Sequence, residues 1–274
     1  MGRPPATGLL TAPAAPTELH ALAEGIAREA GDLLRERFRG PTGQLRAKSS
    51  PTDLVSEADL AAERLIRRRL ADARPHDAIL GEEGGDREPA AGGAGELRWV
   101  VDPLDGTINF LFGIPQWAVS IACEDADGTL AGVVVDPLRG ETFGAVRGGP
   151  PTLDGVPVEA SRREDLATAM VATGFAYEAS VRAAQAEVAA RVLPRVRDLR
   201  RMGSAALDLA WTACARYDAY YERGLQRWDS AAGALMCSCA GLSLRPLAPA
   251  GGLPDGLLVA PAALAESLYG LVGP

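Results

Sequence analysis

The sequence lacks the features that mark membrane proteins and nucleic-acid-binding proteins. No apolar run approaches the roughly 20 residues needed to cross a bilayer, and no long block of lysine and arginine interrupts a chain of net charge −8. The N-terminus also lacks the basic region and apolar core of a signal peptide. These absences predict a cytoplasmic protein that makes no direct contact with nucleic acid or with a membrane.

Histidine and cysteine are also scarce, with two and four residues among 274. The cysteines lie inside apolar segments, which predicts buried, reduced thiols rather than zinc ligands or disulfides. A hydrophobic content of 47% is that of a globular protein, and the length allows one large domain or two lobes that share an interface. No histidine or cysteine suited to nucleophilic chemistry stands near the acidic motifs described next.

The most informative stretch is Asp-Pro-Leu-Asp-Gly-Thr-Ile-Asn-Phe at 102–110. It follows the apolar run 99–101, which predicts a short buried strand, so Asp102 and Asp105 would stand at a strand's end. The intervening proline ends the strand's hydrogen bonding and leaves the Leu104 carbonyl free to point outward. By itself such a stretch is also typical of a turn that caps a helix.

The two residues that follow the second aspartate favour an anion beside these oxygens. Gly106 allows a tight turn, and Thr107 opens a short helix whose free N–H groups would face the anion. Carboxylates and a carbonyl are ligands for a hard cation such as Mg²⁺, and Mg²⁺ beside helix amides suits a phosphate.

Two other motifs change the interpretation of this stretch. Gly-Glu-Glu-Gly stands upstream at 81–84, and Trp-Asp-Ser-Ala-Ala-Gly stands downstream at 228–233. The three motifs in this order resemble the inositol monophosphatase family, a branch of the lithium-sensitive, Mg²⁺-dependent phosphatases. The likeness runs from about residue 47 to about residue 241 and is greatest to the bacterial inositol-1-monophosphatases.

The resemblance implies that two to three Mg²⁺ ions assist hydrolysis of a phosphate monoester by water, without a phospho-enzyme. It assigns the metal ligands as Glu82, Asp102, the Leu104 carbonyl, Asp105 and Asp229. Asp53 and Thr107 would form a dyad that orients the attacking water together with Glu82, and Lys48 and Glu83 would play supporting roles. For Asp229 the residues alone leave open a simple helix cap.

The resemblance also implies a pocket for a small phosphorylated polyol. Its expected lining is Asp105, Gly106, Thr107, Gly203, Ser204, Ala205, Glu222 and Asp229. Glu222 matches an acid that contacts a substrate hydroxyl in inositol-specific members, so inositol 1-phosphate is the expected substrate. The enzymatic alternative is histidinol phosphate, or else a small sugar phosphate or nucleotide phosphate. A protein-binding module in transcription, with incidental catalysis, is the alternative from another class.

The expected fold is α+β, a layered α/β/α/β/α sandwich of the inositol monophosphatase and fructose-1,6-bisphosphatase type. Residues 1–16, rich in Pro, Ala and Gly, are expected to form a disordered leader. An N-terminal lobe at 17–150 would carry the main metal motifs, and a C-terminal lobe at 151–274 would complete the site. The Gly/Ala/Pro-rich stretch 84–95 is expected to be either a loop that closes over substrate or a slack surface insertion. The resemblance further implies a homodimer.

Overall fold

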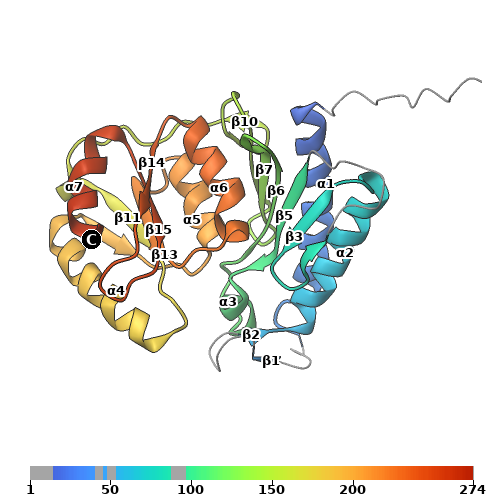
Figure 1. The fold of residues 1–274 in the computed structure, drawn as a ribbon, viewed down its shortest axis with the longest axis horizontal. Helices are drawn as coiled ribbons and strands as arrows, with labels where there is room; N and C mark the ends of the chain where they lie inside the picture. Colours follow the sequence, from blue (N-terminus) through green and yellow to red (C-terminus); the bar gives the residue numbers. More distant parts are fainter. Residues whose placement is uncertain (1–14, 41–45, 48–53, 88–96, 274) are drawn as a thin grey trace, which may run out of the picture.

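The computed structural model of the chain describes residues 15–40, 46–47, 54–87 and 97–273, with the side chains of 46–47 and 54–55 left out. Five layers follow one another across the molecule (Figure 1). Helices α1 and α2 form one outer layer, then come a first sheet, helices α5 and α6, a second sheet, and helices α4 and α7. The layered α/β/α/β/α sandwich expected from the sequence is therefore confirmed.

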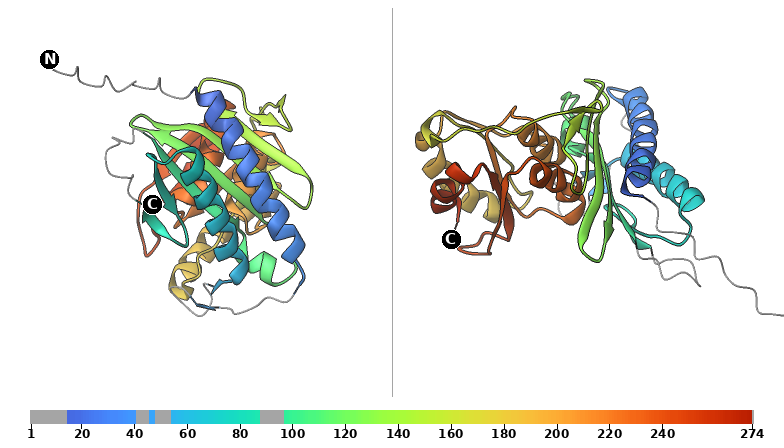
Figure 2. Two further views of the ribbon diagram at one scale, coloured as in Figure 1. Left: turned by 90° about the vertical axis from the view of Figure 1, so that its right-hand side faces the viewer. Right: turned by 90° about the horizontal axis from the view of Figure 1, so that it is seen from above.

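Helices α1 and α2 lie side by side across the outer face of the first sheet (Figure 2). The Ser56 side chain accepts from the amides of Ala58 and Asp59 at the start of α2, and Asp59 accepts in return from the Ser56 amide, which completes a capping box. Buried apolar residues recur at helical spacing on both helices and pack on the strands. The elements of this half are α1 (Pro16–Arg37), β1 (Arg46–Ala47), β2 (Leu54–Val55), α2 (Glu57–Ala73), β3 (Ala78–Gly81), β4 (Gly85–Arg87), β5 (Arg98–Asp105), α3 (Thr107–Leu111), β6 (Ala118–Asp125), β7 (Gly128–Asp136), β8 (Glu141–Val146), β9 (Thr152–Leu153) and β10 (Val156–Pro157).

Within the described residues, the first sheet has eight strands in the order β10-β9-β8-β7-β6-β5-β3-β4. Strands β5 to β8 form an antiparallel meander. Strand β3 instead pairs with β5 in parallel, so the two strands end at the same edge of the sheet. Because β9 and β10 extend the meander, the first sheet continues to Pro157.

The second half alternates strands and helices, and its described strands form a mixed five-stranded sheet in the order β12-β11-β13-β15-β14. Helices α5 and α6 pack against the inner face of the first sheet, and α4 and α7 cover the outer side of the second (Figure 2). The elements are η1 (Leu166–Thr168), β11 (Met170–Thr173), α4 (Ala179–Val192), η2 (Leu193–Arg195), β12 (Asp198–Arg200), α5 (Ala205–Ala213), β13 (Ala219–Arg223), α6 (Arg227–Cys239), β14 (Ser243–Leu247), β15 (Gly256–Ala260) and α7 (Ala262–Val272).

Ion pairs tie the two halves together beside the shared core. Arg227, at the start of α6, donates to the buried carboxylate of Glu124 on β6, and Arg216 makes two hydrogen bonds of 2.6 Å with Glu141 on β8. The first contact fixes the N-terminal end of α6 against the first sheet, and the second fixes the segment that follows α5. No described helix has the length and apolar character that a bilayer span requires, and all four cysteine thiols are free.

Candidate functional site

A pocket of about 530 Å³ opens between the two halves of the molecule. It collects side chains that are far apart in the sequence and were predicted to act together. Its lining includes Glu82, Asp102, Leu104, Asp105, Gly106, Thr107, Gly203, Ser204, Ala205, Glu222 and Asp229. The three acidic motifs and the predicted polyol-binding residues therefore meet in one place.

Parallel pairing of β3 with β5 explains why the first two acids meet. Gly81 on β3 lies opposite Val101 on β5, so Glu82 and Asp102 are the next residues along each strand. The Glu82 amide donates to the Val101 carbonyl at 3.2 Å, which holds this end of the sheet together. Asp102 is only 1% exposed, and its Oδ1 accepts from the Leu104 amide at 3.0 Å.

Beyond Asp102 the pairing of β5 with β6 slips before it resumes at Asp105. The slip spans Pro103, which has no amide hydrogen to donate, and such irregularities re-aim backbone groups beside functional sites. Asp105 then turns toward α5, where its carboxylate accepts from the Ser204 hydroxyl at 2.5 Å and from the Ala206 amide at 2.8 Å. Asp105 thus joins the first sheet to the start of a helix in the second half of the chain.

Asp229 reaches the pocket from the first turn of α6. Its Oδ2 accepts from the Gln226 amide at 2.6 Å, so it caps this helix as well as facing the other acids. Burial raises its pKa well above the usual range, and Asp105, Glu82 and Glu222 raise it further against a lowering by the Gln226 amide. The cap that the sequence left as an alternative is therefore present, and it holds Asp229 in the pocket.

Burial and mutual repulsion disfavour the charged forms of the other acids too. The pKa of Asp102 lies well above its ordinary value, first because of burial and then because of Glu82, Asp105 and Asp229. Burial raises the pKa of Asp105 to about 6, although the Ser204 hydroxyl and the Ala206 amide oppose the shift. A bound cation would reverse these shifts because it stabilises the ionised carboxylates.

The donor set fits a hard divalent cation in chemical type. Carboxylates and one strand-end carbonyl supply oxygen ligands only, which Mg²⁺ prefers. In the described part of the chain, however, no three or more His, Cys, Asp or Glu side chains are gathered so that they could hold a metal ion as they stand. Two of the acids accept hydrogen bonds from amides at the starts of α5 and α6, which hold these side chains in place.

A second acidic group lies near the metal motifs. Glu222 on β13 accepts from the buried Tyr220 hydroxyl at 2.8 Å. Burial raises the pKa of Glu222 to about 7 and raises that of the nearby Asp208 well above its usual range, Glu222 adding to the second shift. A Cβ on Gly174 would lie 2.0 Å from Glu222 Oε1, so only glycine leaves room for this carboxylate. Tyr220 and Asp208 were not predicted to belong to the site.

The turn that carries Glu82 has a support that the sequence analysis also missed. Glu63 on α2 accepts from the amides of Glu83 and Gly84 at 2.7 and 2.9 Å, and Arg67 donates to the same carboxylate at 2.6 Å. A Cβ on Gly81 would stand 2.3 Å from Glu63 Oε1. The i, i+4 spacing of Glu63 and Arg67 was a visible signal, but nothing in it points to a turn twenty residues away.

Asn109, the eighth residue of the central motif, holds the two halves of the pocket in register. Its amide nitrogen donates to the Gln116 carbonyl at 2.7 Å and to the Met202 carbonyl at 2.8 Å, next to Gly203 and Ser204. The side chain is buried, and both of its acceptors are backbone carbonyls. No role for this residue was predicted.

Replacing Asn109 with aspartate keeps its size but removes the donor, leaving two carbonyls facing a carboxylate. We expect Asn109→Asp to lose about 2–4 kcal/mol of unfolding free energy, because each orphaned buried acceptor costs roughly 1–3 kcal/mol. We also expect lower turnover, since the Gly203 segment loses its tie to the metal motif. Denaturant titration and steady-state kinetics measure both, and a variant as stable as the parent would contradict the assigned role.

Two predicted site residues, Lys48 and Asp53, lie outside the described residues, as does most of the stretch 84–95. The Thr107 hydroxyl, predicted to pair with Asp53, lies 2.8 Å from Asp59 Oδ1 and 3.1 Å from the Leu104 carbonyl oxygen. The predicted support from Glu83 is visible only through its backbone amide, which binds Glu63.

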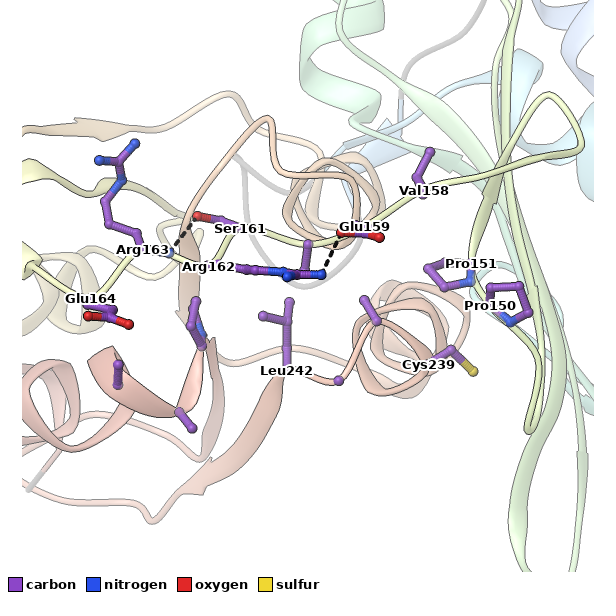
Figure 3. A pocket seen from close by; sticks show the side chains of 16 residues that line it. Pro150, Pro151, Val158, Glu159, Ser161, Arg162, Arg163, Glu164, Cys239 and Leu242 are labelled. Atoms are coloured by element: carbon purple, nitrogen blue, oxygen red, sulfur yellow. Dashed lines mark hydrogen bonds and ion pairs between the residues drawn. The ribbon is translucent and has the colours of Figure 1, made fainter.

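A separate hollow of about 550 Å³ lies on another side of the interface between the two halves (Figure 3). Arg162 pairs with Glu159 at 2.8 Å, and Arg163 pairs with the neighbouring Asp218 at 3.1 Å. None of the predicted site residues lines it. The chemistry predicted from the sequence therefore belongs to the first pocket alone.

Known proteins match the chain along most of its length. The model of the inositol monophosphatase family matches residues 15–269. Inositol-1-monophosphatase SuhB of Mycobacterium tuberculosis is 44% identical over 267 residues, covering 90% of each chain. Nus factor SuhB of Pseudomonas aeruginosa is 44% identical over 223 residues, covering 78% of this chain and 80% of that one.

Solved structures agree with this result. The extragenic suppressor protein suhB of Bartonella henselae superimposes with a TM-score of 0.84 at 33% identity, covering 93% of this chain and 98% of its own. The sequence motifs, the layered fold and the pocket agree with these matches. The chain belongs to the inositol monophosphatase family.

Proposed function

We propose that this family member, a phosphatase by its class, hydrolyses myo-inositol 1-phosphate to inositol and phosphate with the help of Mg²⁺. The observation that carries the proposal is the meeting of the Glu82, Asp102–Asp105 and Asp229 motifs with Glu222 in one pocket. The metal motifs suit a phosphate group, and Glu222 suits a hydroxyl-rich leaving group.

The residues that would hold two to three Mg²⁺ ions are Glu82, Asp102, Leu104 through its carbonyl, Asp105 and Asp229. When bound, Mg²⁺ supplies Lewis-acid stabilisation of the phosphoryl oxygens and makes water a better nucleophile. The Thr107 hydroxyl, buried at the floor of the pocket, orients the attacking water. Gly203, Ser204 and Ala205 bound the space for the polyol, and the ionised Glu222 carboxylate accepts a hydrogen bond from one of its hydroxyls.

The substrate is tested by comparing kcat/KM for inositol 1-phosphate and histidinol phosphate under the same Mg²⁺ concentration. We expect inositol 1-phosphate to be preferred, because Glu222 pairs with a hydroxyl. Preference for histidinol phosphate would keep the phosphatase class and overturn the substrate. Matched assays with another sugar phosphate and a nucleotide phosphate cover the remaining enzymatic alternatives.

Glu222 gives a pH-dependent signature of the same pocket. With its pKa raised to about 7, the carboxylate loses its charge as pH falls through neutrality, and with it a charge-assisted bond to substrate. We expect KM for inositol 1-phosphate to rise below about pH 7, and Glu222→Gln to raise KM about 10- to 100-fold while abolishing that rise. A variant whose KM still climbs below pH 7 would assign the titration to another group.

Glu222→Gln should weaken substrate binding, yet it should stabilise the metal-free chain above neutral pH. An acid whose pKa is raised on folding holds more protons in the native state between its unfolded pKa, about 4.5, and about 7. Native stability from this group is therefore present at low pH and falls as pH rises through that window. We expect Glu222→Gln to raise Tm at pH 8 and to change it little at pH 4.5, as measured by thermal melts in EDTA.

A role in transcription is the second candidate, because relatives of 38–44% identity are named Nus factor SuhB. Capture of partners from cell lysate by the wild-type chain and by Asp102→Asn separates the two functions. Transcription proteins retained equally by both would favour a binding role that is independent of catalysis. The predicted homodimer and cytoplasmic location remain proposals, and light scattering of the purified chain tests the first.

A further inference from the structure

Arg223, the residue after Glu222 on β13, is a cation buried away from solvent. It is 4% exposed, and burial lowers the pKa of its guanidinium. In the described part of the chain its hydrogen bonds go to backbone carbonyls, and no acid forms an ion pair with it. Buried arginines are usually paired with acids, because an unpaired charge is costly to remove from water. The backbone bonds of Arg223 must therefore offset that cost.

The Arg223 guanidinium joins three segments that are apart in the sequence. Nη1 donates to the Ala248 carbonyl at 2.9 Å and to the Pro254 carbonyl at 2.8 Å, and Nη2 donates to the Val272 carbonyl at 2.8 Å. The first two carbonyls stand after β14 and before β15, and the third is at the end of α7. A planar guanidinium suits this arrangement because its donors point in fixed, separate directions. Arg223 therefore ties the end of β13 to α7 and to the connection between β14 and β15.

The same bonds hold the backbone that carries Glu222. Successive side chains of a strand point to opposite faces, so Glu222 lines the pocket while the Arg223 guanidinium lies at the end of α7. On the other side β15 approaches closely, since a Cβ on Gly256 would stand 2.3 Å from the Glu222 carbonyl oxygen and 2.8 Å from Arg223 Cα. The Gly224 amide also donates to the Asp255 carbonyl at 2.8 Å. The strand end is thus fixed from both sides.

We propose that Arg223 is a positioning residue that sets polyol specificity by fixing Glu222 in the pocket wall. The inference rests on the proposed function, in which Glu222 accepts from a substrate hydroxyl. The Glu222 carboxylate has little freedom of its own, because it packs on Gly174 and binds the Tyr220 hydroxyl at 2.8 Å. A shift of the strand end therefore moves the carboxylate away from the hydroxyl. The metal motifs stand on β3, β5 and α6, so hydrolysis itself does not need Arg223.

The test compares kcat/KM for inositol 1-phosphate with kcat/KM for para-nitrophenyl phosphate, whose leaving group offers no hydroxyl to Glu222. We expect Arg223→Met to lower the ratio of the two constants about tenfold, chiefly through KM for inositol 1-phosphate. The rate on para-nitrophenyl phosphate should stay within about twofold of the parent. A variant that loses both activities by the same factor, or neither, would overturn the proposal.

Arg223→Lys keeps the test decisive where the methionine variant does not fold. Lysine retains the charge, but its single ammonium cannot reproduce the fixed directions of the guanidinium donors. We expect the ratio to fall in the same direction as for Arg223→Met. A lysine variant with the parent ratio would overturn the role given to the three carbonyl bonds.

Arg245→Met is the matched control, because Arg245 also joins a strand of the second sheet to α7. Its Nη1 pairs with Glu266 at 2.6 Å and its guanidinium lies over the Tyr269 ring, yet it does not line the pocket. We expect this variant to keep the parent ratio within about twofold even where its Tm falls. A loss of selectivity equal to that of Arg223→Met would assign the effect to the attachment of α7 and overturn the positioning role.

A double-mutant cycle tests whether Arg223 acts through Glu222. Arg223→Met combined with Glu222→Gln should have a ratio no lower than Glu222→Gln alone, and losses that multiply would overturn the proposal. A crystal structure of the metal-free Arg223→Met chain gives a readout that does not depend on substrate. After superposition on the first sheet, the Glu222 carboxylate should be displaced by about 1 Å or more, and an unmoved carboxylate would overturn the inference. A displaced carboxylate together with an unchanged ratio for Glu222→Gln would instead overturn the proposed polyol contact.

Discussion

Asp102→Asn should reduce phosphate release by about 10³-fold, equivalent to ~4 kcal/mol of transition-state stabilisation. Asparagine keeps the side-chain volume and the oxygen that accepts from the Leu104 amide, so the strand end is preserved. It removes a negative charge that lies among Glu82, Asp105 and Asp229 and would help to hold the cation. The loss should therefore appear in turnover, as measured by steady-state kinetics, and not in folding.

The stability of the same variant separates a metal site from a structural cluster. In EDTA, Asp102→Asn should be at least as stable as the parent, because burial already disfavours the charged form of Asp102. Mg²⁺ should raise the Tm of the parent and much less that of the variant, since only the parent gains binding free energy. Asp127→Asn, on the exposed turn between β6 and β7, is the control and should match the parent in both assays. An Asp102→Asn chain that keeps its activity would contradict the assignment.

Gly106→Ala is expected to damage both stability and activity. Gly106 adopts φ +96°, a left-handed conformation that costs other residues roughly 1–2 kcal/mol. A Cβ there would also stand 2.9 Å from the Gln116 carbonyl oxygen and 3.2 Å from the Gly203 carbonyl oxygen. The added methyl group would push the central motif away from the polyol-binding segment. We expect a loss of about 3 kcal/mol in unfolding free energy and at least a tenfold fall in kcat/KM.

Gly140→Ala separates the two causes of that loss. Gly140 has φ +69°, yet a Cβ there would meet nothing within 4 Å. Gly140→Ala therefore has the backbone strain without a steric clash. It should lose about 1–2 kcal/mol of unfolding free energy and keep kcat/KM unchanged. Unfolding free energies are measured by denaturant titration. Equal losses in both variants would show that the contacts of the added Cβ at position 106 with Gln116 and Gly203 do not contribute to the loss.

The strand end, the turn and the helix starts around the acidic motifs could be predicted from local patterns, whereas the layered fold was implied by the resemblance to the family. The apolar run before Asp102 predicts the end of a strand, and the glycine and threonine that follow predict the turn and short helix observed there. The motif around Asp229 likewise predicts the start of a helix, which α6 confirms. Each of these features is set by residues within one or two turns of the chain.

The supports of the site could not be predicted because they depend on contacts between distant segments. Asp59 belongs to the capping box at the start of α2, but nothing local shows that its second oxygen meets Thr107. Asn109 gave no signal because its partner, the Met202 carbonyl, is a backbone group that any residue could supply. The supporting role of Glu63 could not be predicted either, because the amides it binds belong to a turn that folds against α2.

The central claim is that this pocket hydrolyses a phosphate monoester of a polyol when Mg²⁺ is present. The most direct measurement is phosphate release from inositol 1-phosphate by the purified wild-type chain, first with Mg²⁺, then after EDTA, and then with Mg²⁺ restored. We predict release with Mg²⁺, none in EDTA, and full recovery when the metal is returned. Release that continues in EDTA, or no release in any of the three conditions, would contradict the claim.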